Sequence, residues 1–104
     1  PVLRIDDESL NPSSFALGKP YPNPFNPLVE INLLVDDIGT YQINIHNIKG
    51  ELINNWDVDF TQKGSHIIQW NAMNYSGSSV PSGVFFISVK NQNESKQRKV
   101  LLLR

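Results

Sequence analysis

The chain reads Tyr21-Pro22-Asn23-Pro24-Phe25-Asn26-Pro27 and, one residue later, Val29-Glu30-Ile31-Asn32-Leu33. Three prolines within the first stretch fix φ, remove backbone donors and push each preceding residue toward extended geometry. We therefore expect a stiff, extended lead-in that cannot enter the middle of a sheet. The residues after it alternate between apolar and polar, which predicts a β-strand with one buried face. We expect the rings of Tyr21 and Phe25 to hold the lead-in against a β-core.

Alternation of apolar and polar residues recurs along most of the chain and predicts β-strands throughout. The clearly alternating segments cover residues 29–35, 41–46, 52–60, 66–70, 84–90 and 96–103. Shorter apolar segments lie at residues 2–5, a candidate strand, and at residues 15–17. Turn residues separate the segments at a spacing of roughly 8–12 residues, without a helical periodicity longer than a turn. The pattern predicts an all-β fold, a single antiparallel immunoglobulin-like β-sandwich of about seven strands.

Composition excludes several classes of function. The 104 residues suffice for one domain with one core, and a net charge of −1 gives no field that favours nucleic acid or a membrane. Cysteine is absent, which removes disulfides, thiolate metal sites and cysteine nucleophiles. The sequence contains no run of about 18 apolar residues and no signal peptide. We expect a piece of a longer secreted or surface protein, with residues 1–14 as a linker and residues 15–104 as the domain.

Six landmarks occur in a fixed order. Tyr-Pro-Asn-Pro-Phe-Asn-Pro opens the series at residues 21–27, and the others lie at residues 31–33, 41–53, 64–70, 82–86 and 99–104. Together they resemble the type A C-terminal sorting domain of the type IX secretion system of Bacteroidetes-like bacteria. That family is related to the immunoglobulin-like domain of the flagellar hook-capping protein. Where the family often has Trp-Asp-Gly, this chain has Trp70-Asn71-Ala72.

The resemblance implies a targeting role rather than an enzymatic one. Cargo proteins of this family cross the inner membrane by an N-terminal signal, and the folded domain is then recognised in the periplasm and at the outer-membrane translocon. In many members a sortase-like peptidase cuts ahead of the domain, here around residues 6–14, and attaches the cargo to the cell surface. The implied partners are the type IX translocon, its shuttle and sortase proteins, and the covalently attached cargo. No cofactor, nucleic acid or small-molecule substrate is implied, and the cargo is expected at the cell surface or outside the cell.

Three sets of residues are candidates for the recognition signal. We expect Gly83 to supply a backbone angle that a Cβ would obstruct. The other candidates are Tyr21, Pro22, Asn23, Pro24, Phe25, Asn26 and Pro27 in the lead-in, and Lys99, Val100, Leu101, Leu102, Leu103 and Arg104 in the last strand. The structural alternative for the lead-in is to cover one end of the sandwich. The last strand could be an edge protected by lysine, or a docking strand for β-augmentation. Such an exposed strand would also allow two copies to pair edge to edge.

Candidate catalytic groups are few. His46 and His66 are the only imidazoles, and neither stands in a nucleophile motif or at metal-ligand spacing. We expect His66, on the apolar face of its predicted strand, to be a hydrogen-bonded histidine in the core or at its rim. Asp57 and Asp59 alternate with apolar residues, which is typical of a solvated strand face rather than of a glycosidase cleft.

Binding alternatives rest mainly on loop residues. Asp36-Asp37 and the loop of Asn71 and Asn74 contain oxygen ligands of the kind that calcium takes, but turn chemistry explains both. Trp56 and Trp70 are expected to point inward, which leaves the ring of Tyr75 alone on a loop for a sugar. The alternative to a sorting domain is a structural immunoglobulin-like accessory module for assembly, adhesion or carbohydrate binding.

Overall fold

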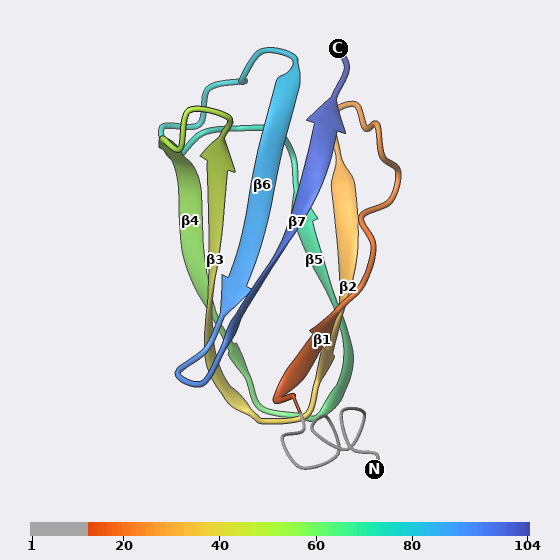
Figure 1. Ribbon diagram of the computed structural model, residues 1–104, viewed down its shortest axis with the longest axis vertical. Helices are drawn as coiled ribbons and strands as arrows, with labels where there is room; N and C mark the ends of the chain where they lie inside the picture. The colour runs from red at the N-terminus through yellow and green to blue at the C-terminus, as the bar shows by residue number, and fades with distance from the viewer. Residues whose placement is uncertain (1–12) are drawn as a thin grey trace, which may run out of the picture.

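Seven antiparallel strands form two packed sheets in the computed structural model, which describes residues 13–104 (Figure 1). One sheet has the order β1-β2-β5 and the other the order β4-β3-β6-β7. The strands are β1 (Phe15–Leu17), β2 (Val29–Val35), β3 (Gly39–Asn47), β4 (Leu52–Phe60), β5 (Gly64–Trp70), β6 (Gly83–Lys90) and β7 (Ser95–Leu102). Within the described part of the chain, no helix is long and apolar enough to cross a membrane. The prediction of an all-β immunoglobulin-like sandwich is confirmed.

The core consists of the inward-facing residues of both sheets. Every second side chain of β2, β3 and β6 is buried, as the alternation of apolar residues predicted. The largest fully buried side chains are Phe15, Phe25, Ile31, Leu33, Tyr41, Ile43, Ile45, Ile87 and Leu102. Trp70 is buried, but Trp56 is only partly buried because it lies on β4, an edge strand. The inward direction predicted for both indoles is therefore confirmed, with a shallower position for Trp56.

The turns follow the polar and glycine signals of the sequence. Between β3 and β4, the Asn47 side-chain oxygen accepts hydrogen bonds from the amides of Lys49 and Glu51, each at 2.9 Å. Gly50 completes this turn with a φ of 84°, a value that residues with a Cβ rarely adopt. This turn joins the alternating segments 41–46 and 52–60 that the sequence predicted as strands, and the two strands pair with each other.

The two ends of the sandwich differ in what they contain (Figure 1). We call the end with the start of β6 and the last residues of β7 the tail end, which lies at the top of the figure. The opposite end holds the start of β1, the 36–38 turn and the β6–β7 turn, and we call it the linker end. The candidate strand at residues 2–5 and most of the expected linker lie outside the described residues. Ser14, the last residue of that expected linker, is buried in the sandwich.

Candidate recognition site at the tail end

Residues 21–27, which we call the proline loop, are held at their start by pairing with β2. The Tyr21 amide donates to the Glu30 carbonyl at 2.8 Å, and the Glu30 amide donates back at 2.9 Å. The residues between them form a series of bends, so the expectation of an extended lead-in is wrong. The expectation of a buried Tyr21 is also wrong, since this residue is 77% exposed. Directly paired residues share a sheet face. Because Tyr21 is paired with Glu30, on the outer face of β2, the Tyr21 side chain lies on that outer face as well.

Phe25 connects the proline loop to the last strand. Its side chain is 2% exposed and packs against the indole of Trp70, with ring centroids 5.8 Å apart. Its amide donates to the Leu101 carbonyl at 2.9 Å, and its carbonyl accepts from the Leu103 amide at 3.0 Å. Phe25 thus adds a short parallel bridge to the outer edge of β7. The predicted exclusion of the loop from the middle of a sheet is confirmed.

Asn23 extends this pairing with its side chain. The Oδ1 atom accepts from the Leu101 amide at 2.9 Å, and the Nδ2 group donates to the Lys99 carbonyl at 3.2 Å. A single side-chain amide therefore occupies one donor and one acceptor of the strand edge, as a neighbouring strand would. The sequence marked Asn23 only as part of a proline-rich motif, because no local pattern reveals a partner 78 positions away.

Two basic side chains of β7 reach across to the backbone of β1 and Gly18. Lys96 Nζ donates to the Phe15 carbonyl at 2.7 Å. The Arg98 guanidinium donates to the carbonyls of Leu17 and Gly18 at 2.5 and 3.0 Å. The prediction that the last strand lies at a sheet edge is confirmed. Its edge is not free for β-augmentation between residues 99 and 103, because the proline loop pairs there with backbone groups of Lys99, Leu101 and Leu103.

Gly83 and Arg104 have structural roles at the same end. Gly83 lies opposite Leu102 in the ladder between β6 and β7. It does not have a positive φ, and an added Cβ would lie 3.9 Å from Phe85, an ordinary contact. The expectation that a Cβ would be obstructed at Gly83 is therefore wrong. We call residues 99–104 the tail. Arg104 Nε donates to the Val80 carbonyl at 2.7 Å, which joins the tail to the loop after β5.

One departure from the sorting-domain pattern, Ala72 in place of glycine, lies in the loop after β5 at a position with a left-handed backbone. Ala72 is fully buried with a φ of 61°, and its carbonyl accepts from the Arg104 guanidinium at 3.3 Å. A left-handed backbone costs a residue with a Cβ about 1–2 kcal/mol, which glycine avoids. The glycine that the family often has at this position is thus the residue that the backbone favours.

Burial divides the signal candidates into a buried group, an exposed group and two partly buried residues, Gly83 and Leu101. Phe25, Val100 and Leu102 belong to the core and hold the site in place. The exposed candidates are Tyr21, Pro22, Asn23, Pro24, Asn26, Pro27, Lys99, Leu103 and Arg104. Leu101 is partly buried on the outer face of β7. The structure brings the proline loop, the start of β6 and the last strand together as one surface at the tail end.

The linker end carries a polar network instead. The Ser14 amide and hydroxyl donate to Glu94 Oε2 at 2.5 and 2.8 Å, and Asn91 Nδ2 donates to the Ser14 hydroxyl oxygen at 2.8 Å. The amides of Asp36 and Asp37 both donate to the Ser14 carbonyl at 3.0 Å. The hydrogen bond from the Ser14 amide is the main cause that lowers the pKa of the Glu94 carboxyl.

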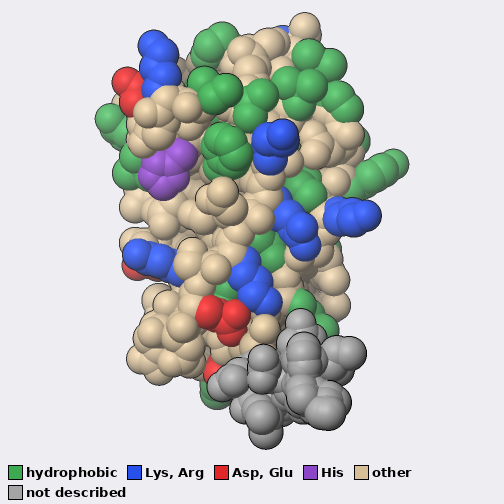
Figure 2. Space-filling model, in the orientation of Figure 1, with side chains coloured by type: hydrophobic (Ala, Val, Ile, Leu, Met, Phe, Trp, Pro, Cys, Tyr) green, Lys and Arg blue, Asp and Glu red, His purple; other side chains and the backbone are tan. Residues whose placement is uncertain are grey.

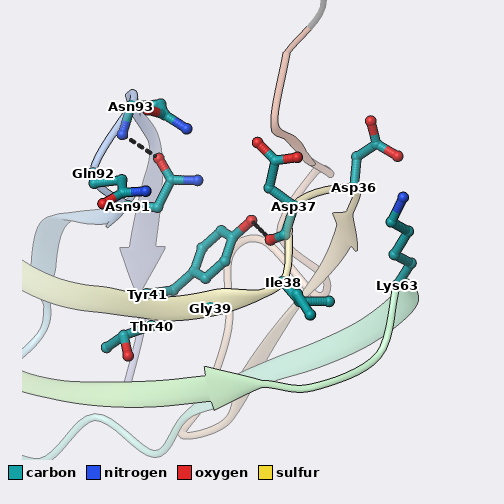
Figure 3. A pocket seen from close by; sticks show the side chains of 10 residues that line it. All are labelled: Asp36, Asp37, Ile38, Gly39, Thr40, Tyr41, Lys63, Asn91, Gln92 and Asn93. Carbon is teal, nitrogen blue, oxygen red and sulfur yellow. Dashed lines mark hydrogen bonds between the residues drawn. The ribbon is translucent and has the colours of Figure 1, made fainter.

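A hollow of about 550 Å³ lies beside this network, between the 36–38 turn and the β6–β7 turn. Figure 3 shows the Tyr41 hydroxyl at its wall, where it donates to the Asp37 carbonyl at 2.6 Å. Burial raises the pKa of Tyr41. The side chains of Asp36 and Lys63 lie on the far side of the hollow from Asn91 (Figure 3). Residues 13–104 hold no group of three His, Cys, Asp or Glu side chains that could bind a metal ion.

The remaining candidates have the structural roles that we expected. His66 is a rim histidine whose Nε2 lies 2.9 Å from the Gln62 carbonyl and whose ring packs on Phe60. Asp57 and Asp59 are exposed on the outer face of β4. Tyr75 is exposed on its loop, whereas Trp70 is buried and Trp56 is partly buried against the core.

Solved structures with the same fold include those of PorU, PorZ and FlgD. PorU from Porphyromonas gingivalis superposes with a TM-score of 0.67 and 14% identity over 89% of this chain and 10% of PorU. PorZ, described as an essential surface component of the type IX secretion system of that bacterium, gives 0.57 and 22% over 93% of this chain and 12% of PorZ. FlgD from P. aeruginosa gives 0.57 and 17% over 71% and 58%.

The chain therefore corresponds to about a tenth of PorU or PorZ. No curated protein matches it in sequence. At the level of families, residues 29–95 match the FlgD Ig-like domain, which covers β2 to the start of β7. This chain belongs to the FlgD Ig-like domain family.

Proposed function

We propose that this domain is a C-terminal sorting domain that directs a larger cargo protein through the type IX secretion system. In this proposal the domain has no catalytic activity and acts as a folded recognition surface. Its partners are the translocon and the shuttle and sortase proteins, and the upstream cargo is attached covalently. The cargo passes through the periplasm and reaches the cell surface or the medium.

The observation that carries the proposal is the pairing of the proline loop with the tail. Both are landmarks of the sorting-domain resemblance, and they lie about 75 residues apart in the sequence. In the fold they contact each other through Asn23, Phe25, Leu101 and Leu103. A receptor could therefore read both landmarks at once, on one surface.

The position of Ser14 supports the same proposal. Ser14 is anchored at the linker end, so the polypeptide that precedes it joins the sandwich there. The proline loop and the tail lie at the opposite end (Figure 1). A cargo attached at the linker end would leave the tail end accessible to a receptor. Any cut by a sortase would fall before Ser14, because this residue is part of the fold.

The test is export of a reporter fused to residues 1–104, in a host with a type IX system and in its translocon-null sibling. The proposal predicts export only in the competent host. A native sorting domain on the same reporter is the positive control. Retention of the folded fusion in the periplasm of both hosts, while the control is exported, would contradict the proposal.

A further inference from the structure

The outer face of the four-stranded sheet has a polar half and an apolar half. The polar half lies toward the linker end and includes Thr40, Gln42, Asn44, Asp57, Asp59 and Ser88. The apolar half lies toward the tail end, and we define it by His46, Leu52, Val84, Phe86, Lys99 and Leu101. In Figure 2, green side chains gather over the upper part of this face, beside the purple histidine and next to blue side chains. The middle of the face is mainly tan.

The register of the strands places the apolar half in two adjacent rows. His46 is paired with Leu52 on one side and with Phe86 on the other, and Phe86 is paired with Lys99. Because directly paired residues of antiparallel strands share a face, these four side chains form one row across the sheet. Val84 and Leu101 are paired in the same way and form the next row.

An irregularity in β3 and β4 creates one end of the first row. The register shifts between Ile45 and His46, so that Ile45 faces Asn54 while His46 faces Leu52. Ile53, the extra residue, packs against the core, and Leu52 is left 43% exposed on the outer face. A bulge of this kind changes the direction of side chains along a strand. Here it places a leucine on an outer face where regular alternation would have put the side chain inward.

Lys99 gives the apolar half a single charge without a partner on its own face. The ion pair found within residues 13–104 joins Lys96 to Glu94, at the linker end. The carboxylates of the outer face, Asp57 and Asp59, are in the polar half. An apolar surface with one cation is complementary to an apolar surface with one carboxylate, and such charge pairs fix the orientation of a complex.

We propose that the apolar half is a docking surface for a protein partner whose own contact surface is apolar and places an Asp or Glu against Lys99. The inference rests on the proposed function in one respect, since it takes the partner to be a protein of the export machinery. Docking occurs on the face of the sheet, since the proline loop occupies the β7 edge between residues 99 and 103. Lys99 and Leu101 belong both to this face and to the tail, which joins the two surfaces.

Charge reversal at two matched lysines tests the inference in the export assay. Lys99 and Lys90 lie on the same outer face, the first in the apolar half and the second at the far end of β6. A like charge against the partner's carboxylate would lower export of Lys99→Glu by about tenfold or more. Lys90→Glu would change export by less than about twofold, and Lys99→Arg would keep it. Export of the unchanged domain together with equal export of Lys99→Glu and Lys90→Glu would overturn the docking surface and leave the sorting function intact.

Photo-crosslinking decides the inference even if the unchanged fusion is not exported. A photoreactive phenylalanine analogue replaces Phe86 in one fusion and Gln42, in the polar half, in another. The inference predicts an adduct in the competent host from position 86 only, with a host peptide that contains Asp or Glu, and loss of the adduct in Lys99→Glu but not in Lys90→Glu. No adduct, equal adducts from both positions, or an adduct between two copies of this domain would each overturn it.

Discussion

The two ends of the sandwich are held together by different kinds of contact. At the tail end, a buried phenylalanine, backbone pairs and one neutral side-chain amide attach the proline loop to β7. At the linker end, the Glu94 carboxylate and the Asn91 side-chain amide attach Ser14 to the β6–β7 turn. The attachment of the proline loop to β7 therefore depends on apolar burial, and the attachment of Ser14 depends on a charge.

This difference separates what each end can do. Apolar burial and neutral hydrogen bonds do not titrate, so we expect the contacts between the proline loop and β7 to be independent of pH. The network of Ser14 and Glu94 depends on an ionised carboxylate, so we expect the stability of the linker end to respond to pH.

The largest effect is expected from Phe25→Ala. Removing a buried aromatic side chain leaves a cavity beside Trp70 and should lower the free energy of unfolding by about 3–5 kcal/mol. Phe25→Leu keeps most of the volume and should cost less than half as much. Urea unfolding followed by tryptophan fluorescence measures both variants. An effect of Phe25→Ala below about 1 kcal/mol would mean that the loop is not anchored by this ring.

A smaller loss is expected from Glu94→Ala at neutral pH. The variant leaves the Ser14 amide and hydroxyl without their acceptor, which should cost about 1–3 kcal/mol of unfolding free energy. Asp57→Ala is the matched control, since this exposed carboxylate should change stability by less than about 0.5 kcal/mol. Equal effects of the two substitutions would show that the linker end is not held by this network.

The pH dependence of the Glu94 contribution follows from the lowered pKa. A carboxyl whose pKa is lower in the folded state stabilises fully above its unfolded value of 4.5, and the contribution is lost as pH falls through the folded pKa. The stability gap between the natural chain and Glu94→Gln should therefore narrow as pH falls below that value. Thermal unfolding across this range measures the gap, and a gap that widens in acid would contradict the assignment.

Asn23→Ala should cost about 1 kcal/mol, because one amide and one carbonyl at the edge of β7 lose a partner but remain near solvent. Asn26→Ala, in the same loop, is the control and should stay within about 0.5 kcal/mol. Unlike the Glu94 effect, the Asn23 effect should be the same at every pH between 4 and 8, within the error of the unfolding curves. A pH-dependent Asn23 effect would remove the contrast between the two ends.

Period-2 alternation was enough to predict most of the fold. The apolar positions on the inward face of β2, β3 and β6 are buried as the sequence indicated, because each strand has one face against the other sheet. The direction of Tyr21 was not predictable in the same way. It depends on the pairing of its backbone with Glu30, which the proline-rich sequence does not encode.

The candidate site was predictable as a set of segments but not as an arrangement. The resemblance marked both the proline loop and the tail, yet nothing local in either segment indicates that Phe25 pairs beside Leu102. The contact between Ser14 and Glu94 spans 80 positions and joins an expected linker residue to an expected turn. Long-range pairs of this kind follow from the packing of the two sheets and leave no periodic pattern.

Amide hydrogen exchange of Leu101 and Leu103 is the most direct test of the pairing between the proline loop and the tail. Their amides point to the outer edge of β7 and donate to Asn23 and Phe25. The Gln97 amide is an internal reference. It lies four residues before Leu101, so the alternation of the ladder places it on the same edge, and the proline loop does not reach it. The account predicts slow exchange at Leu101 and Leu103 in the 104-residue chain and, in Asn23→Ala, faster exchange at Leu101. Exchange at both leucines as fast as at Gln97 would contradict it.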